Sequence, residues 1–375
     1  TMIYLDNAAT GGEKPAAVQN AVLAAMQVCA NPGRSGHDAS LAAAERVLAC
    51  RDLLSDLFVG YGYERVVFTK NCTEALNLML LGTLRAGDHV VTTCLEHNSV
   101  LRPLEHLRRT KRVTYDVAPL TDGKLLPEAI AALVRPETRA VCVTSASNVT
   151  GECPDLHAVR ARIPARVLLF VDGAQGAGHL PLRMRETGID ALALAGHKGL
   201  HAIQGAGALL FSERTMPDSV LFGGTGSESH SLTMPAFYPD RLESGTLSYP
   251  AICSLFEGAL LVRSRRSEGA RKLITLTARV RDALVAMDGY RTYFLPNACG
   301  IAAFSHARIP SETLAGLLNE RGIAVRGGLH CAPLAHKALG TFPLGLVRAS
   351  FSPFQGTAEA DALIAALRDI ALTSA

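Results

Sequence analysis

Apolar and polar positions along the first 211 residues predict helices and strands that alternate. Two helical patterns come first, at Pro15–Cys29 and Ser40–Phe58. Short apolar runs typical of strands then alternate with segments of helical period. The predicted strands are Arg65–Phe68, His89–Thr92, Arg112–Val117, Ala140–Thr144, Val167–Val171, Ala191–Ala195 and Ala208–Phe211, and the predicted helices are Thr73–Leu84, Val100–Arg108, Pro127–Val134 and Asp155–Arg162. This alternation predicts an α/β fold with a mostly parallel central sheet sandwiched by helices.

The rest of the chain predicts a smaller α+β part. Residues Gly223–Ser248 are rich in Gly, Ser and Pro and indicate a loop, and a long helical pattern follows at Ala251–Met287. Beyond it we expect strands at Ile301–Phe304, Ala324–Arg326 and Leu346–Ser350, and helices at Ser311–Glu320 and Thr357–Leu372. We therefore expect a large domain of residues 15–260 and a small domain made of residues 1–14 together with residues 261–375.

Composition narrows the class of protein. The 375 residues are 48% apolar and 19% charged, which suits a two-domain enzyme with a large core. The net charge of +3 and the scattered Lys and Arg residues give no reason to expect nucleic acid. No run of about eighteen apolar residues indicates a membrane span. Residues 1–6 lack the pattern of a secretory signal, so we expect a cytoplasmic enzyme.

Nine cysteines occur without a C-x-x-C pair. An odd count without paired spacing fits neither a disulfide framework nor a zinc site, so we expect no metal. Most of these cysteines are expected to be small buried hydrophobic residues.

Two polar residues follow neighbouring predicted strands. Asp172 ends the apolar run Phe170-Val171, and Lys198 follows Ala191–Ala195 within Gly196-His197-Lys198. Residues at the carboxyl ends of parallel strands converge on ligands. A lysine that can form a Schiff base and an acid that keeps a pyridine nitrogen protonated are what pyridoxal 5′-phosphate (PLP) requires. Alone, Asp172 is equally well explained as a helix or turn cap, and Lys198 as a solvated side chain.

Two further segments are compatible with such a site. Asn71-Cys72-Thr73-Glu74 lies at a strand-to-helix junction, where backbone N–H groups and the Thr73 hydroxyl suit a phosphate. A plain capping box explains it as well. His97, within Glu96-His97-Asn98, could stack on a flat ring or move a proton, although a lone loop histidine is more often only a hydrogen-bonded polar residue.

Near the C-terminus, Cys331 and Arg348 are the candidates for chemistry. Cys331 lies in the Gly-rich segment Arg326–Pro333 beside His330, an environment that stabilises a thiolate. Arg348 ends a predicted strand and could clamp a substrate carboxylate. A surface salt bridge is the alternative for Arg348.

The order of these segments resembles one family, the class V aminotransferase-like PLP enzymes, and within it the cysteine desulfurases and selenocysteine lyases. Asp172-Gly173-Ala174-Gln175 followed by Gly196-His197-Lys198 is the most specific part of the resemblance. The other matching segments, which together span nearly the whole chain, are Tyr4–Thr10, Thr73-Glu74, Glu96-His97, Ser147–Gly151, Glu243–Thr246 and Arg326–Pro333.

The resemblance implies a role for each matching residue. Lys198 would hold PLP as a Schiff base, Asp172 would pair with its ring nitrogen, and His97 would stack on the ring. Cys331 would accept sulfur, with Lys198 and His97 as the other catalytic residues. Arg348 would bind the substrate carboxylate. Further cofactor-binding residues would be Gln175, Asn148, Thr73, Cys72, His197 and, from the neighbouring subunit of a homodimer, Thr246; further substrate-binding residues would be Asn7, His37 and Arg326.

The implied activity is conversion of L-cysteine to L-alanine, with a persulfide on Cys331 for sulfur transfer. The short loop around Cys331 resembles the second desulfurase group, whose members use a partner acceptor protein. Selenocysteine lyase on L-selenocysteine, or another class V lyase or aminotransferase in which Cys331 is incidental, remains an alternative. Ala195 and Cys72 depart from the family pattern, since donors to the phosphate are usual at both positions.

Overall fold

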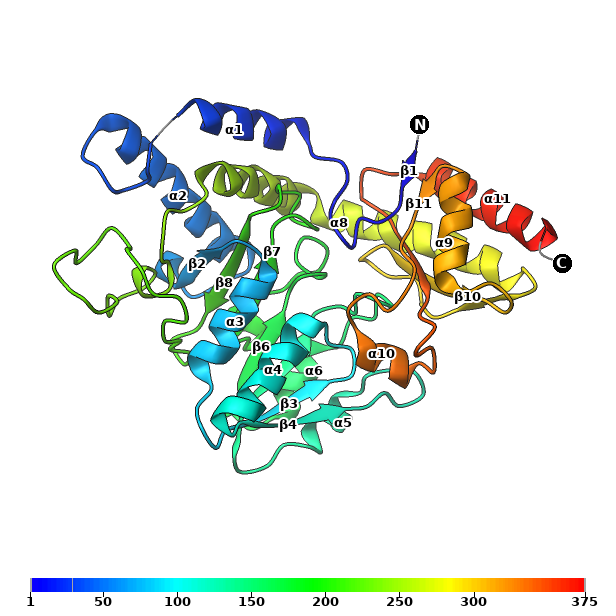
Figure 1. Ribbon diagram of the computed structural model, residues 1–375, viewed down its shortest axis with the longest axis horizontal. Helices are drawn as coiled ribbons and strands as arrows, with labels where there is room; N and C mark the ends of the chain where they lie inside the picture. Colours follow the sequence, from blue (N-terminus) through cyan, green and yellow to red (C-terminus); the bar gives the residue numbers. More distant parts are fainter. Residues whose placement is uncertain (1, 29, 374–375) are drawn as a thin grey trace.

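The computed structural model, which describes residues 2–28 and 30–373, is built around a twisted sheet (Figure 1). Within those residues the sheet has seven strands in the order β2-β8-β7-β6-β5-β3-β4. Their bounds are β2 Val66–Thr69, β3 His89–Thr93, β4 Thr114–Ala118, β5 Thr138–Thr144, β6 Leu168–Asp172, β7 Ala191–Ala195 and β8 Gly207–Phe211. β8 runs antiparallel to both its neighbours and the other pairs are parallel. The predicted α/β fold with a mostly parallel sheet is confirmed.

Helices cover both faces of this sheet. β6 shows why the sequence requires this, because every residue of the strand is buried. Leu168 and Phe170 face the core beneath α3 (Cys72–Thr83) and α4 (Asn98–Lys111). Leu169 and Val171 face the opposite core, where the helices are α2 Asp38–Leu57, α5 Pro127–Ala131, α6 Leu156–Arg162 and α8 Tyr249–Val285. A side chain of this size contributes about 1.5–3 kcal/mol when fully buried, so an uninterrupted apolar strand is stable only with both faces covered.

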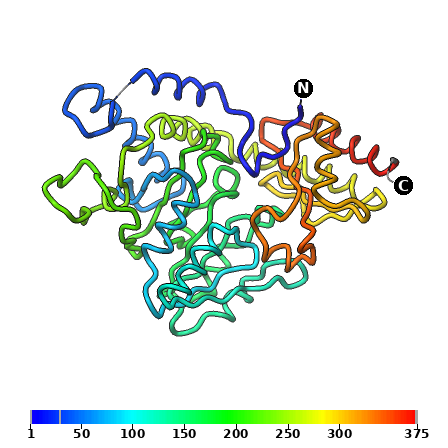
Figure 2. Tube along the Cα trace, in the orientation of Figure 1, coloured from blue at the N-terminus to red at the C-terminus, as the bar shows by residue number. Residues whose placement is uncertain are grey.

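The C-terminal part has its own core and smaller sheets. β10 (Ile301–His306) lies between β12 (Val347–Ser350) and β9 (Tyr290–Thr292), and β1 (Ile3–Tyr4) pairs in parallel with β11 (Ile323–Ala324). α9 (Ser311–Glu320) and α11 (Thr357–Thr373) pack beside them. The 37-residue α8 runs along both parts, and the N-terminal trace returns from the small part to α1 (Ala16–Gln27) over the large one (Figures 1 and 2).

Several predicted boundaries were wrong for local reasons. The strand expected from Arg112 begins at Thr114, because Arg112 takes a left-handed conformation that ends α4. The helix expected to reach Val134 ends at Ala131. Of Ala324–Arg326, only Ala324 is in a strand, and Arg326 makes a single bridge to Arg348. The short elements β1, β9, α7 (Met184–Thr187) and α10 (Pro333–Ala338) were not predicted, since two to six residues are too few to show a period.

The predicted end of the first helix, Cys29, lies outside the described residues. The proposed division into residues 15–260 and the remainder stays a prediction. In the part of the chain that the structure describes, no helix is long and apolar enough to cross a membrane.

Candidate active site

A cleft lies at the carboxyl ends of β2, β3, β5, β6 and β7. The side chains lining it come from the turns that follow those strands, so residues far apart in sequence meet at one edge of the sheet. Its lining residues are Asn71, Cys72, Thr73, Leu76, His97, Ser99, Thr144, Ala146, Asn148, Asp172, Ala174, Gln175, Ala195, His197 and Lys198. The cleft thus brings together eight of the residues singled out from the sequence.

Asp172 is buried and Lys198 is half-buried in this cleft. Burial lowers the pKa of Lys198, and the nearby Asp172 partly opposes that shift. Burial disfavours the charged ammonium and so favours the neutral amine, which is the form that acts as a nucleophile or base. Asp172 Oδ1 accepts hydrogen bonds from Ala174 N at 2.9 Å and from Cys72 Sγ at 3.5 Å. The carboxylate is therefore fixed at the end of β6.

Cys72 is not a second reactive thiol. It is the first residue of α3 and is buried, and burial raises its pKa well above the ordinary value, with the charge of Asp172 adding to the effect. A thiol in that environment stays protonated. The structure gives Cys72 a hydrogen bond to Asp172.

His97 and Thr73 are connected through Ser99. The His97 Nδ1 lies 3.0 Å from Ser99 Oγ and accepts a hydrogen bond from Ser99 N at 3.0 Å, while Ser99 Oγ lies 2.8 Å from Thr73 Oγ1. Burial lowers the pKa of His97, and the charge of Asp172 opposes this. These contacts hold the imidazole at the N-terminus of α4. Sequence reasoning missed Ser99, although it stands two residues after His97.

The N-terminus of α3 forms one end of the cleft. Asn71 caps this twelve-residue helix by accepting a hydrogen bond from Glu74 N at 2.9 Å. Unpaired N–H groups of a first helical turn favour an anion. His197 lies nearby, with Nδ1 3.0 Å from Thr10 Oγ1, and burial lowers its pKa to about 4. Thr10 was quoted only as part of a motif, and the structure gives it this contact.

Gln175 and Asn148 lie on the side of the cleft that faces the C-terminal part. Gln175 Nε2 donates to Ala8 O at 3.0 Å. Asn148 Nδ2 donates to His330 O at 2.7 Å, whereas its Oδ1 is buried without a hydrogen-bond partner. Leaving a buried polar atom unpaired costs about 1–3 kcal/mol. The Asn148 oxygen therefore indicates that a polar ligand completes this wall.

Arg348 is the largest fully buried side chain among the described residues. Its guanidinium donates to Asn148 O at 2.8 Å and to Asp6 Oδ1 at 3.0 Å, and its Nε is buried with no partner. Burial lowers its pKa and Asp6 opposes that shift. Arg326 pairs with it through the backbone, with Arg348 N donating to Arg326 O at 2.8 Å. Asp6 was not predicted as a site residue. The one feature of the sequence that could have indicated it is its position next to Asn7, which was predicted.

The Cys331 loop is hydrogen-bonded to the cleft. Asn98 N donates to Cys331 O at 2.8 Å, next to His97, and Asn148 holds His330 O. Both His330 and Cys331 have positive φ, at 52° and 55°, which is costly for residues other than glycine. His330 is in turn held by Arg326 O at 3.1 Å and by the buried ring of His336 at 3.5 Å. The strained turn leaves Cys331 exposed.

Besides Cys331, Arg326 and Arg348, three further predicted residues are absent from the lining of the cleft in a single chain. Asn7 lines a small cavity on another side of Lys198 and donates through Nδ2 to Ser350 O at 2.9 Å. His37 is exposed and caps α2, accepting from Ser40 N at 3.3 Å. Thr246 lines a separate cavity with Lys70 and Glu74. The structure therefore does not bring His37 or Thr246 to Lys198 of the same chain.

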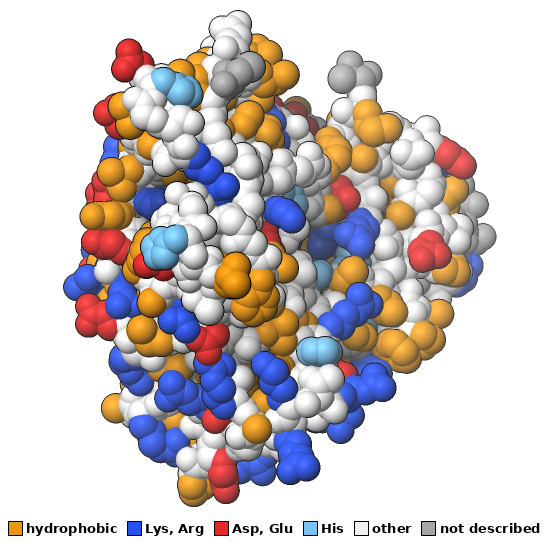
Figure 3. Space-filling model, turned by 60° about the vertical axis from the view of Figure 1, so that its left-hand side comes forward, with side chains coloured by type: hydrophobic (Ala, Val, Ile, Leu, Met, Phe, Trp, Pro, Cys, Tyr) orange, Lys and Arg blue, Asp and Glu red, His pale blue; other side chains and the backbone are white. Residues whose placement is uncertain are grey.

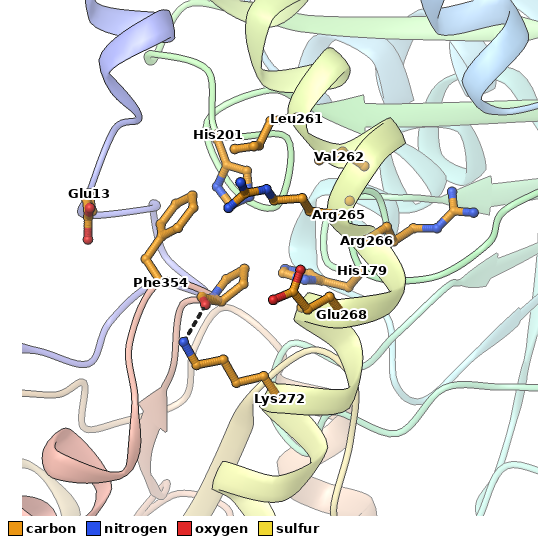
Figure 4. Close-up of a pocket in the computed structure, with 13 residues that line it drawn as sticks. Glu13, His179, His201, Leu261, Val262, Arg265, Arg266, Glu268, Lys272 and Phe354 are labelled. Carbon is orange, nitrogen blue, oxygen red and sulfur yellow. Dashed lines mark hydrogen bonds between the residues drawn. The ribbon is translucent and has the colours of Figure 1, made fainter.

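A larger cavity of about 360 Å³ beside α8 is a second concave site (Figure 4). Arg265, Glu268 and Lys272 line it from α8, with the rings of His179 and His201 opposite. Lys272 Nζ donates to Pro353 O at 3.0 Å. Burial lowers the pKa of His179 to about 4 and that of His201 to about 3, so both are neutral. It lacks the half-buried lysine and the buried carboxylate of the Lys198 cleft.

The surface is hollowed between the large and small parts, with Lys, Arg and His side chains in the hollow (Figure 3). Among the described residues, no three His, Cys, Asp or Glu side chains are grouped to hold a metal ion.

The residues of the cleft fit PLP. Lys198 offers a half-buried amine and Asp172 a buried acid, while α3 offers a helix N-terminus and Asn148 an unpaired oxygen. The fold and the cleft together define a PLP-binding enzyme with a doubly wound α/β domain.

Comparisons with known proteins agree with this assignment to the PLP-binding enzymes. The aminotransferase class-V model matches residues 3–363. Cysteine desulfurase CsdA of Escherichia coli K12 is 30% identical over 97% of this chain and 93% of that protein. A probable cysteine desulfurase of Aeropyrum pernix is 32% identical over 99% of this chain and 95% of that protein. The apo structure of a cysteine desulfurase from Thermococcus onnurineus NA1 superposes with a TM-score of 0.92 at 27% identity, covering 99% of this chain and 95% of that one.

The chain therefore belongs to the aminotransferase class-V family, in its cysteine desulfurase group. Members of this family depend on PLP, which confirms the predicted cofactor. The individual residue roles stay predictions.

Proposed function

We propose that the protein converts L-cysteine to L-alanine and carries the released sulfur as a persulfide on Cys331. One observation supports this most. The loop that bears Cys331 is hydrogen-bonded to the Lys198 cleft at two points, Asn98 N to Cys331 O and Asn148 Nδ2 to His330 O. These bonds support a position of the Cys331 thiol near the mouth of the PLP site, as the cysteine desulfurase relatives lead one to expect.

Residues of the cleft would hold the cofactor. Lys198 would bind it covalently, and Asp172 would keep its ring nitrogen protonated. The first turn of α3 with Thr73 and His197 would bind the phosphate, and Cys72 would act through its bond to Asp172. His97 would stack on the ring, with Gln175 and Asn148 at its edge. When bound, PLP supplies a protonated ring that accepts electrons from the Cα of an amino acid.

Lys198 would also transfer the proton of the substrate Cα. The lowered pKa of its amine, caused first by burial, leaves the Nζ lone pair available to take a proton from the substrate Cα and to return it.

Arg348 would orient the substrate. Its unpaired Nε is a donor for the carboxylate of cysteine, and Asp6 and Asn148 O fix the guanidinium plane. Asn7, His37 and Arg326 would line the substrate side. A charged N–H donor held in a fixed plane gives a bound carboxylate a defined orientation, so the substrate thiol would be presented to the loop of Cys331.

Cys331 would complete the reaction. Its thiolate attacks the substrate sulfur, an S–S bond forms as the substrate C–S bond breaks, and the Cα and Cβ of the product gain protons. The balance is L-cysteine plus enzyme thiol giving L-alanine plus enzyme persulfide. The persulfide sulfur remains exposed with Cys331 and open to a sulfur-acceptor protein.

The site would be completed by a second copy of the chain. Thr246 does not reach Lys198 within one chain, and we propose that it touches the cofactor phosphate of the neighbouring subunit in a homodimer. A cytoplasmic location stays a prediction.

An amino-acid panel tests the function. Holoenzyme supplied with L-cysteine should release alanine in amounts equal to the sulfur recovered by a thiol reductant. Pyruvate in place of alanine would contradict the proposal and favour another class V lyase. L-selenocysteine turned over with L-cysteine left untouched would contradict it in favour of a selenocysteine lyase.

A further inference from the structure

A buried histidine lies behind the turn that carries Cys331, and the proposed reaction gives it no role. His336 belongs to α10, and its side chain is fully buried. α10 lies where the small part meets the large one (Figure 1), and Ala332 and Ala335 pack in the core of the large part. Thr341 follows the helix and is buried as well. These two polar side chains are thus held inside the molecule, where they need hydrogen-bond partners.

Four residues form a continuous chain of polar contacts from Thr341 to Arg326. Thr341 Oγ1 lies 2.8 Å from His336 Nδ1, and His336 Nε2 lies 3.5 Å from His330 Nδ1. The two imidazole rings are within 21° of parallel. His330 Nε2 lies 3.1 Å from Arg326 O. The chain of contacts therefore ends on the backbone of the loop that bears Cys331.

The protons of this chain can be placed from its fixed end. A carbonyl oxygen only accepts, so His330 Nε2 carries the proton that is donated to Arg326 O. Burial lowers the pKa of His330 to about 3 and also lowers the pKa of His336, so each ring is neutral and has one N–H. His330 Nδ1 is then an acceptor for His336 Nε2, and His336 Nδ1 accepts from the Thr341 hydroxyl. The Arg326 carbonyl and the Thr341 hydroxyl thus fix the tautomers of both rings.

The ring of His330 and the strand of Arg348 share one acceptor. Arg326 O accepts from His330 Nε2 at 3.1 Å and from Arg348 N at 2.8 Å. The peptide of His330 is held as well, since Asn148 Nδ2 donates to His330 O at 2.7 Å. His330 and Cys331 both have positive φ, a conformation that persists only where surrounding contacts impose it. The contacts of His330 therefore hold the Cys331 turn at a set place relative to Arg348.

We propose that His336 and Thr341 are positioning residues for Cys331. They act through His330, whose ring they hold in place, and so fix the thiol relative to Arg348. Without the Thr341 hydroxyl, His336 Nδ1 has no donor, the Nε2 proton is free to move to it, and His330 loses its partner. The strained turn then relaxes toward ordinary backbone angles. The thiol is no longer held where the sulfur of a bound cysteine would meet it, a consequence that rests on the proposed function.

A second buried pair of the same chemistry lacks this connection. His89 Nδ1 lies 2.8 Å from Thr138 Oγ1, the same separation as between His336 and Thr341. His89 and Thr138 are buried and are the first residues of β3 and β5, so they lie at the edge of the sheet opposite the cleft. A role in stability alone would be shared by both pairs, whereas a role in presenting Cys331 belongs to one of them.

Hydrogen–deuterium exchange and steady-state rates of the holoenzyme test the assignment. Thr341→Val removes the hydroxyl but keeps the shape of the side chain. We expect it to speed amide exchange in a peptide of residues 327–332 about five- to tenfold, as for one lost hydrogen bond. Alanine release from L-cysteine should fall about 10- to 100-fold in kcat, the effect of misplacing a reacting group. KM should stay within about twofold, because the side chain of Arg348 is untouched.

Two control variants separate positioning from stability. Thr341→Ser keeps the hydroxyl and should restore both the exchange rate and kcat. Thr138→Val breaks the matched pair and should change neither quantity, whatever it does to the thermal unfolding midpoint.

Two results in a protein that releases alanine would overturn the assignment. One is a Thr341→Val variant in which either the exchange of residues 327–332 or kcat equals that of the unmodified protein. The other is a loss in Thr138→Val or Thr341→Ser as large as that in Thr341→Val. Faster exchange of the Thr341→Val turn in a protein that never releases alanine would support the hold on the turn while contradicting the proposed function, so the two failures are distinguishable.

Discussion

The backbone N–H of Asn98 donates a hydrogen bond of 2.8 Å to the carbonyl oxygen of Cys331. Asn98 begins α4 directly after His97, and Cys331 lies in a loop of the small part. The bond joins Asn98, the neighbour of the residue proposed to stack on the cofactor (His97), to the residue proposed to take sulfur. The positions of the two are therefore coupled through a single peptide group.

The charge of Asp172 is expected to govern electron withdrawal by the cofactor. Asp172→Asn keeps the shape of the side chain and its contact with Ala174 N but removes the negative charge. We expect PLP to remain bound, with alanine release reduced on the order of 100-fold, as for loss of a preorganised electrostatic partner. Absorption spectra and steady-state rates measure the two effects. Unchanged turnover would show that another group protonates the ring.

Arg348 is expected to act in substrate binding. Arg348→Lys retains the positive charge but loses the planar pair of donors, and a hydrogen bond to a charged group contributes about 1.5–3 kcal/mol. We expect KM for L-cysteine to rise about tenfold or more, with a smaller change in kcat. Thermal unfolding of the variant is the control, because the lysine also loses Asn148 O as a partner. A KM equal to that of the unmodified protein would exclude Arg348 as the carboxylate clamp.

Glu96 is expected to make stability fall as pH rises. It is fully buried and holds the ends of β3 and β5 by accepting from Thr93 Oγ1 at 2.6 Å and Thr144 N at 2.9 Å. Burial raises its pKa from 4.5 to about 8. Between these values the folded protein keeps a proton that the unfolded chain releases, so raising the pH favours unfolding.

Glu96→Gln removes this proton linkage. Compared with the unmodified protein, the variant should lose less of its unfolding free energy between pH 5 and pH 8. Urea unfolding at several pH values measures the difference. Parallel pH profiles for the two proteins would mean that Glu96 is ionised in the folded state.

Mixed dimers test whether Thr246 serves the neighbouring site. Lys198→Ala removes the lysine of its own chain, and Thr246→Asp places a negative charge where the phosphate of the other chain is proposed to lie. Each variant should be inactive alone. Unfolding and refolding them together in equal amounts should restore about a quarter of normal activity, because half of the dimers would carry one intact site. If mixed dimers form but activity does not recover, Thr246 does not contact the phosphate of the neighbouring subunit.

Most of the large sheet and the residues at its edge could be predicted from the sequence. β6 and β7 show unbroken apolar runs, and the polar residues after them converge because parallel strands share a carboxyl edge. Contacts between the two parts could not be predicted. Asp6 beside Arg348 and Asn148 beside His330 depend on how the small part packs against the large one, and no local pattern records that packing.

The most direct test of the central claim is to measure the mass of the peptide that contains Cys331. Holoenzyme mixed with L-cysteine, without a reductant or acceptor, is quenched by alkylation and digested. We predict one added sulfur on the Cys331 peptide, formed with one alanine per site, and neither product from Cys331→Ser while that variant still binds PLP. Alanine released at the normal rate by Cys331→Ser, or added sulfur found on a different cysteine, would contradict the proposed mechanism.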